Sequence, residues 1–221
     1  MKLASAAPLA LFAAVGLMAS TQAAATVLTF EDLSVGAALS NQYAGQGVTF
    51  SPNAFTGAGG PTGPWATNTN LTIVSSTGSD IGGLGSPSLV SGNIVRSFNG
   101  WLSENGDPSL GAAFSTPVSS VGVDFAGVAT PASVRLFVYD GLTLLHTVAG
   151  STTGQIHLGY SAASITRVVI TAGDFFDWVG FDNFSFTPIE QNVGTVPEPG
   201  PLALLAMGLG GLAALRRRRN D

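Results

Sequence analysis

Short apolar runs separated by turn residues fill the central part of the chain. The runs are rich in Val, Ile, Phe and Thr, and Gly, Pro, Ser and Asn divide them, which is typical of β-strands joined by turns. Within residues 120–128, Val121, Val123 and Phe125 alternate with smaller or polar residues, as in a half-buried strand. No helical period extends through this region, so we expect an all-β domain of about ten strands, a jelly-roll-like β-sandwich. The runs are residues 26–33, 47–51, 70–76, 93–102, 111–116, 120–128, 132–141, 142–150, 154–161, 165–173 and 179–186.

Two details of this pattern predict local geometry. Phe181 and Phe184 are both large and apolar but have opposite parity, and a regular strand does not place such residues on one face. A β-bulge at Asp182–Asn183 would bring both to the same face, and a strand buried on both faces is the alternative. Asp140-Gly141 lies between two strand-like runs and predicts a tight hairpin.

The first 25 residues have the organisation of a secretory signal peptide. A single charge at Lys2 precedes an apolar run at residues 8–19, and small residues follow, with cleavage expected after Ala23 or Ala25. A buried amphipathic helix is disfavoured because the run has no polar face. We therefore expect a signal helix at residues 1–25, recognised by the Sec translocon, and export of the remaining chain.

The last 26 residues, 196–221, form three consecutive elements. Their apolar segment at residues 201–215 would measure about 22 Å as a helix, which is short against a bilayer core of about 30 Å. Basic residues stay on the cytoplasmic side of a membrane, so we expect a C-terminal transmembrane helix with a stop-transfer block, held only transiently in the inner membrane. The flanking elements are the motif Val196, Pro197, Glu198 and Pro199 and the block Arg216, Arg217, Arg218 and Arg219.

This order of motif, apolar helix and arginine cluster resembles the PEP-CTERM sorting signal of Gram-negative bacteria. The resemblance implies that an exosortase cleaves near the Pro-Glu-Pro motif and passes the protein to the cell surface or extracellular matrix, in a setting of exopolysaccharide and biofilm. A plain C-terminal membrane anchor is the alternative. The expected organisation is a signal peptide at 1–25, a β-sandwich domain at 26–190, a linker at 191–195 and the sorting signal at 196–221.

The charge of the exported part excludes one class of partner. Residues 26–196 contain eleven acidic residues and three arginines, hence a net charge of −8, and no lysine. Phosphate recognition needs clusters of Lys and Arg, so we expect no nucleic acid as a partner and regard cations as better ones. The chain has no cysteine, so its stability depends on packing, with metal binding as a supplement.

Acidic residues at the two ends of the domain are the candidate metal ligands. The first and last strands of a sandwich are often neighbours, which would bring Glu31 or Asp32 close to Asp182. Both ends resemble those of calcium-stabilised extracellular jelly rolls, including carbohydrate-binding modules and MAM-like domains. That resemblance implies a structural Ca²⁺ held by Glu31 and Asp182, since calcium prefers carboxylate oxygens. The alternative is that these acids are solvated residues at a strand edge.

Aromatic and histidine side chains are the remaining candidates. Trp65, in a Gly/Pro-rich loop, and Trp178, after an acidic and aromatic stretch, are candidates for stacking on sugar rings. His146 and His157 lie in neighbouring runs and form a weak candidate metal pair, although packing or surface roles are commoner. No metalloprotease or nucleophile-elbow motif occurs, and no thiol is present.

The sequence therefore favours a noncatalytic protein of the cell surface or biofilm matrix, associated with glycan or exopolysaccharide. Its expected partners are exosortase, the Sec translocon, extracellular polysaccharide and, transiently, the inner membrane. A structural or adhesive protein that acts through protein–protein contacts is the alternative. A polysaccharide hydrolase has less support, because the sequence singles out no pair of carboxylates among its acids.

Overall fold

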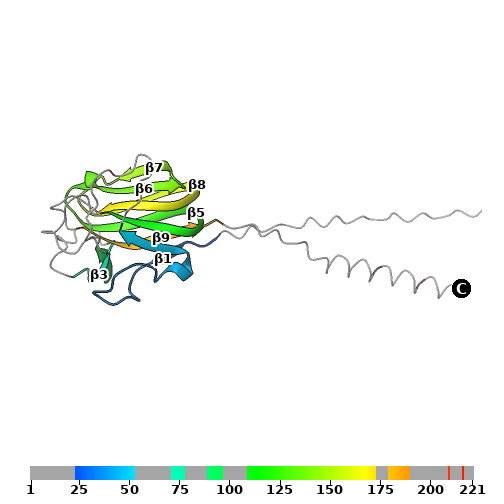
Figure 1. Ribbon diagram of the computed structural model, residues 1–221, viewed down its shortest axis with the longest axis horizontal. Coiled ribbons are helices and arrows are strands. Elements are labelled where there is room, and N and C mark those ends of the chain that lie inside the picture. The colour runs from blue at the N-terminus through cyan, green and yellow to red at the C-terminus, as the bar shows by residue number, and fades with distance from the viewer. Residues whose placement is uncertain are drawn as a thin grey trace, which may run out of the picture. The chain divides into compact units, whose positions relative to one another are not determined.

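The computed structural model describes residues 23–52, 71–77, 89–96, 109–172 and 179–189, together with Leu209 and Arg216. Between residues 23 and 189 the described residues form antiparallel β-strands and two short 3-10 turns, with no α-helix (Figure 1). The prediction of an all-β domain is therefore confirmed. The strands are β1 (Thr26–Leu28), β2 (Val48–Pro52), β3 (Thr72–Ser75), β4 (Asn93–Arg96), β5 (Ser109–Val128), β6 (Val134–Asp140), β7 (Thr143–Ala149), β8 (Gly154–Ala172) and β9 (Gly180–Pro188); the turns are η1 (Ala44–Gln46) and η3 (Pro131–Ser133).

Strands β5 and β8 organise the sheet because each runs through both of its parts. The hydrogen-bonded order is β3-β4-β9-β5-β8-β6-β7, with β1 also paired to β9 and β2 to β5. The beginning of β5 pairs with β2 and with the end of β8, which itself pairs with β6. The end of β5 pairs with β9 and with the beginning of β8. We call the part that contains β2, β6 and β7 the first half of the sheet, and the part that contains β1, β3, β4 and β9 the second half.

The length of β5 and β8 corrects the predicted strand pattern. Runs 111–116 and 120–128 are one strand, and so are runs 154–161 and 165–173. Ser115, Thr116 and Pro117 are exposed, and the pairing of β5 with β8 shifts between Ala113 and Val118. Because the ladder is interrupted there, a proline without an N–H group is tolerated within a continuous strand.

The two halves of the sheet face each other across an aromatic core. Phe50 of β2 and Phe184 of β9 have ring centroids 5.1 Å apart in an edge-on arrangement, which is favourable for aromatic pairs. Phe114 of β5 contacts Phe186 in a tilted arrangement, with ring centroids 5.3 Å apart. Burial of each large apolar side chain contributes about 1.5–3 kcal/mol, so this cluster is a main source of stability in a chain without disulfides. The core aromatic residues are Phe30, Tyr43, Phe50, Phe125, Phe181, Phe184 and Phe186.

The predicted bulge is present in β9. Gly122 pairs with Ser185 and Asp124 pairs with Asp182, so β9 contains one residue more than β5 over this interval. Asn183 has a φ of 49°, in the left-handed region. The extra residue turns Phe181 and Phe184 to the same side, and both are fully buried.

The hairpin between β6 and β7 is also present, one residue later than predicted. Asp140 pairs with Thr143, so the two turn residues are Gly141 and Leu142 rather than Asp140 and Gly141. Gly141 has a φ of 58°, which glycine adopts at little cost. Asp140 instead ends β6 as a paired strand residue.

The first and last strands are neighbours, as expected. Strand β1 pairs with β9, with Thr26 opposite Phe186 and Leu28 opposite Phe184.

The chain divides into two compact units, Met1–Ile189 and Glu190–Asp221. The predicted signal helix (except its last residues), the linker, the sorting motif and most of the apolar segment lie outside the described residues. Leu209 and Arg216 are helical and exposed, and none of the described helical residues belongs to a helix long and apolar enough to span a membrane.

Candidate functional site

A short segment crosses the face of the second half of the sheet that points away from the main core. This segment, Leu89–Asn93, is called the strap below. Val90 and Ile94 pack on Ala126 of β5 in a small apolar cluster that is separate from the main core. Side-chain oxygens from three parts of the chain then accept hydrogen bonds from the backbone of the strap. These bonds join the N–H groups of Leu89 and Val90 to Gln155 Oε1 (2.5 and 2.9 Å), that of Ser91 to Asp182 Oδ2 (3.3 Å) and that of Asn93 to Glu31 Oε1 (2.9 Å).

Asp182 is a buried acid at the centre of this arrangement. Its side chain is 2% exposed, and its Oδ1 also accepts a hydrogen bond from the N–H of Asn183 at 2.6 Å. Burial raises the pKa of Asp182 to about 6; hydrogen bonds from Asn183 and Ser91 oppose this rise, and the nearby charges of Glu31 and Asp124 add to it. The interpretation of Asp182 as a solvated strand-edge residue is therefore wrong, whereas Glu31 is exposed.

Glu31 and Asp182 are brought together by the fold, but Asp32 is not part of the group. Glu31 and Asp182 bind strap residues two positions apart, and their charges interact. Asp32 instead accepts a hydrogen bond of 2.5 Å from the Tyr43 hydroxyl. Burial raises the pKa of Tyr43, and its bond to Asp32 raises it further.

Backbone strain lies directly beside both acids. Among the described residues, Phe30 (φ 59°) and Asn183 (φ 49°) are the non-glycine residues with left-handed backbone, a conformation that costs about 1–2 kcal/mol. Phe30 precedes Glu31, and β1 ends at Leu28, earlier than the end of the predicted run 26–33. Asn183 follows Asp182 and offsets its strain with bonds from Nδ2 to Leu89 O (2.8 Å) and Asp124 Oδ2 (3.0 Å).

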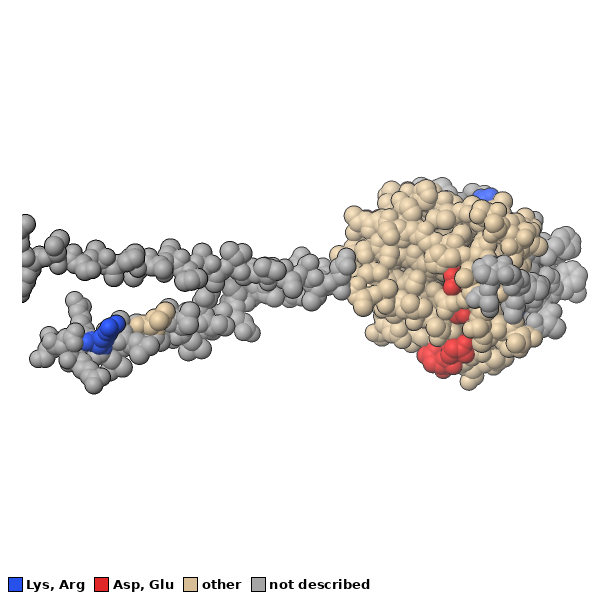
Figure 2. Space-filling model, turned by 180° about the vertical axis from the view of Figure 1, so that it is seen from behind, with Lys and Arg blue, Asp and Glu red and all other residues tan. Residues whose placement is uncertain are grey.

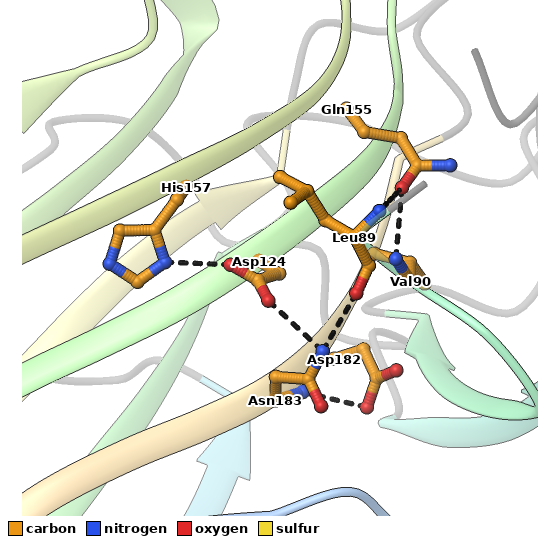
Figure 3. A network of polar contacts seen from close by, with 7 residues as sticks. All are labelled: Leu89, Val90, Asp124, Gln155, His157, Asp182 and Asn183. Atoms are coloured by element: carbon orange, nitrogen blue, oxygen red, sulfur yellow. Dashed lines mark hydrogen bonds and ion pairs between the residues drawn. The ribbon is translucent and has the colours of Figure 1, made fainter. Parts of the chain in front are cut away.

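Asp124 and His157 form a second polar pair next to the strap. Asp124 Oδ1 lies 2.6 Å from Nδ1 of His157, and the two side chains are 14% and 56% exposed (Figure 3). An ionised carboxylate offers only acceptors, so Nδ1 carries the proton and Nε2 is left as an acceptor in the neutral ring. Sequence pattern alone does not predict this pair: alternation places Asp124 outward on its strand, but the register that sets His157 opposite Asp124 is not local.

Glu31 and Asp182 could bind calcium only through carboxylate oxygens that mostly accept backbone hydrogen bonds already. The described residues hold no group of three or more Asp, Glu or His that is placed to hold a metal ion. Both oxygens of Asp182 and one of Glu31 already accept backbone hydrogen bonds. Each carboxylate oxygen has a second lone pair, so the two acids retain capacity for a cation that carbonyl oxygens or water would complete.

Other predicted site residues are dispersed or outside the described structure. His146 of β7 stacks on Tyr160 with ring centroids 4.7 Å apart, and β7 pairs with β6 rather than with β8. His146 therefore contacts Tyr160, whereas His157 is hydrogen-bonded to Asp124. The residues outside the described part of the chain are Trp65, Trp178, Val196, Pro197, Glu198, Pro199, Arg217, Arg218 and Arg219.

The surface of the domain carries few charges. In Figure 2 the acidic side chains gather in a short row on one face, and most of the surrounding described surface is uncharged. Arg96, Arg135 and Arg167 are the basic residues between residues 26 and 196. The arrangement can therefore offer hydrogen-bond acceptors and small hydroxyl groups to a ligand, but few partners for an anion.

Comparison with known proteins gives distant structural similarity only. No protein-family model and no curated protein sequence matches the chain. The K2 cleaved adhesin domain of Lys-gingipain is 16% identical with a TM-score of 0.46, over 74% of this chain and 99% of that chain. A mutant of a family 29 carbohydrate-binding module is 11% identical with a TM-score of 0.30, over 63% and 92%. The family 11 carbohydrate-binding module of the cellulase Lic26A-Cel5E of Clostridium thermocellum is 8% identical with a TM-score of 0.33, over 76% and 97%. The domain is thus distantly similar in structure to adhesin and carbohydrate-binding module β-sandwiches.

Proposed function

We propose that this chain is an exported, noncatalytic protein of the bacterial cell surface or biofilm matrix whose jelly-roll domain binds extracellular polysaccharide. The observation that carries the proposal is the network of Figure 3, in which side chains from β5, β8 and β9 are held in fixed positions at a sheet surface. Fixed donors and acceptors reduce the ordering cost of binding a flexible polar ligand.

The location follows from the ends of the sequence. A signal peptide at residues 1–25 would direct the chain to the Sec translocon, and the motif, apolar helix and arginine block at 196–221 would hold it in the inner membrane for exosortase. After processing, the domain would reside at the cell surface or in the matrix. We further propose that Glu31 and Asp182 share a structural Ca²⁺, which would neutralise two neighbouring carboxylates.

A noncatalytic role agrees with the surroundings of His157. Among the described residues its ring is hydrogen-bonded to Asp124 alone, so no nucleophile is activated by it. Glycoside hydrolysis would need two carboxylates that flank a cleft. Asp182 is instead occupied with the strap.

A second candidate, an adhesive protein that assembles through protein contacts, is favoured by one observation. Strand β7 lies at the end of the described sheet order and contains no charged residue, and the neighbouring Leu142 is 73% exposed. Edge strands of soluble proteins usually carry charges that prevent pairing with another chain. Replacement of Thr147 by Lys would then reduce cell aggregation without changing glycan retention.

Polysaccharide retention tests the main proposal. The exported chain (residues 26–221), purified in detergent, is passed over immobilised exopolysaccharide from the producing bacterium and over a panel of neutral, amino-sugar and uronic polysaccharides. We expect retention on the native material and on at least one neutral polymer, reversed by the soluble form. Absence of retention on every glycan would refute the proposal, and retention without release of hydrolysis products would separate binding from catalysis.

A further inference from the structure

Two glycines lie opposite each other in the interior of the sheet, where glycine is normally unfavourable. Gly122 of β5 pairs with Gly159 of β8 on one side and with Ser185 of β9 on the other. Neither glycine has the left-handed backbone that would require glycine. Glycine within a strand costs about 0.5–1 kcal/mol, and such positions often mark a close approach to the backbone.

The two glycines make room for the imidazole of His157. A methyl group on Gly122 would lie 2.9 Å from His157 Cε1 and 2.7 Å from Ser185 Oγ, and one on Gly159 would lie 3.0 Å from His157 Nε2. Real methyl groups essentially never make contacts under 3.0 Å, so the two contacts at Gly122 exclude a side chain there, and the contact of 3.0 Å at Gly159 is tight. The ring therefore lies along the sheet over the glycine pair, while its Nδ1 is fixed by Asp124.

Small hydroxyl residues continue this surface on the side away from the strap. Ser120 pairs with Ser161 of β8 and with Thr187 of β9, and its hydroxyl lies 2.8 Å from Thr187 Oγ1. The three strands thus present two consecutive cross-strand rows of Gly, Ser and Thr, bounded on one side by Asp124 and His157. A surface of this kind has a flat floor with polar groups at its margin.

We infer that these rows form the contact surface for a sugar ring of an uncharged polysaccharide. This inference rests on the proposed function and assigns the binding site to these rows. Gly159 is exposed and the neighbouring row carries only small side chains, so a flat ring can approach the backbone beside the imidazole of His157. A ring hydroxyl donates a hydrogen bond to His157 Nε2, and Ser185 Oγ is placed for a neighbouring hydroxyl. Such sites combine close van der Waals contact with a few fixed polar groups.

Charge selects the class of sugar. Asp124 adjoins this surface, and Asp182 and Glu31 lie on the strap side. The charges of Asp124 and Glu31 both interact with Asp182. An anionic ring, such as a uronic acid, would be repelled by these carboxylates. An uncharged ring meets acceptors and hydroxyl groups without an electrostatic penalty, so neutral polymers are the expected ligands.

The test compares two histidine variants of the exported chain. His157→Ala removes the acceptor at the proposed surface, whereas His146→Ala removes the exposed histidine of β7 that stacks on Tyr160. Binding to dextran, mixed-linkage β-glucan and galactomannan is measured by affinity electrophoresis at pH 7.5, with alginate as the anionic polymer. Gly159→Ser, whose side chain would fill the surface at Gly159 and press on the imidazole of His157, provides a second test if His157→Ala does not fold.

We expect His157→Ala to weaken binding to the preferred neutral polymer at least tenfold, Gly159→Ser to weaken it severalfold, and His146→Ala to bind within twofold of wild type. Equal binding by wild type, His157→Ala and Gly159→Ser would overturn the site while leaving the proposed function in place. Preference for alginate would overturn the inferred ligand class. If wild type binds no glycan at all, both the function and this site are refuted.

Discussion

Asp182 and Ser91 are joined by a hydrogen bond from the backbone N–H of Ser91 to a buried carboxylate oxygen, 3.3 Å long. The bond attaches the strap to β9, and its acceptor is the buried acid whose pKa is raised to about 6. The ionised carboxylate is the better acceptor, yet burial and two neighbouring acids disfavour it. The stability of the domain should therefore depend on pH through this one side chain.

The first prediction is that metal-free domain becomes less stable as pH rises from about 4 to 6. The pKa of Asp182 is raised from 3.8 to about 6 in the folded chain, so the folded state holds a proton that the unfolded state has lost. Its contribution is complete below the unfolded pKa and disappears as pH rises through the folded pKa, a loss of about 2–3 kcal/mol. Urea unfolding in EDTA between pH 4 and 7.5 measures it.

Two variants separate Asp182 from the other acids. Asp182→Asn removes the titrating group, so the decrease between pH 4 and 6 should be much smaller than in wild type. Asp140→Asn, at the end of β6, removes an acid far from the strap in the sheet order and should keep the wild-type profile. An unchanged profile in Asp182→Asn would show that the buried carboxyl does not titrate in this range.

The second prediction concerns the strained residue of the bulge. Asn183→Ala removes the bonds from Nδ2 to Leu89 and Asp124 and leaves a left-handed backbone on a residue that disfavours it. We expect a loss of about 2–4 kcal/mol, from two hydrogen bonds and the strain. Asn183→Gly loses the same bonds but relieves the strain, so it should be about 1 kcal/mol more stable than Asn183→Ala. Chemical unfolding compares them; equal stability would refute the role of strain.

The bulge shows what local pattern can predict. The opposite parity of two large apolar residues, Phe181 and Phe184, requires one extra residue between them if both are buried in one core, and that inference needs no knowledge of the partner strand. The run of short β-rich segments likewise predicts an all-β domain. In contrast, residues 117–119 read as a break between two strands, because the sequence does not show that Pro117 lies where the ladder is already interrupted.

The site could be predicted only in part. Glu31 and Asp182 were expected to be close because the first and last strands of a sandwich are often neighbours, and β1 does pair with β9. The strap was not predicted, since it depends on side chains from distant elements that bind one backbone segment. The pair Asp124–His157 was missed for the same reason: two residues 33 positions apart meet through a cross-strand register.

The third prediction is that calcium stabilises the domain. A ligand that binds only the folded state contributes about 2.7 kcal/mol at a hundredfold excess over its Kd, or roughly 5–10 °C in Tm for a domain of this size. Thermal unfolding in EDTA, millimolar calcium and magnesium measures the shift. Because metal ligands must be deprotonated, the shift should be larger at pH 7.5 than at pH 5.5.

Variants of the two acids make this prediction specific. Glu31→Gln and Asp182→Asn should each abolish most of the calcium-dependent shift, whereas Asp32→Asn should retain it, because Asp32 binds Tyr43 instead. Gly92→Ala, whose methyl group would meet the Glu31 carboxylate, should reduce the shift as well. The same Tm in EDTA and in calcium would mean that the acids serve the strap without a metal.

The last prediction concerns the arginine block at residues 216–219. Replacement of all four arginines by serine removes the charge that we expect to keep the end of the chain on the cytoplasmic side. The apolar segment is short and contains three glycines, so without this charge it should slip across the membrane. Pulse-labelling should then show the unprocessed chain accumulating or escaping uncleaved. Replacement by four lysines keeps the charge and should preserve processing. Normal processing kinetics in the serine variant would contradict the stop-transfer role.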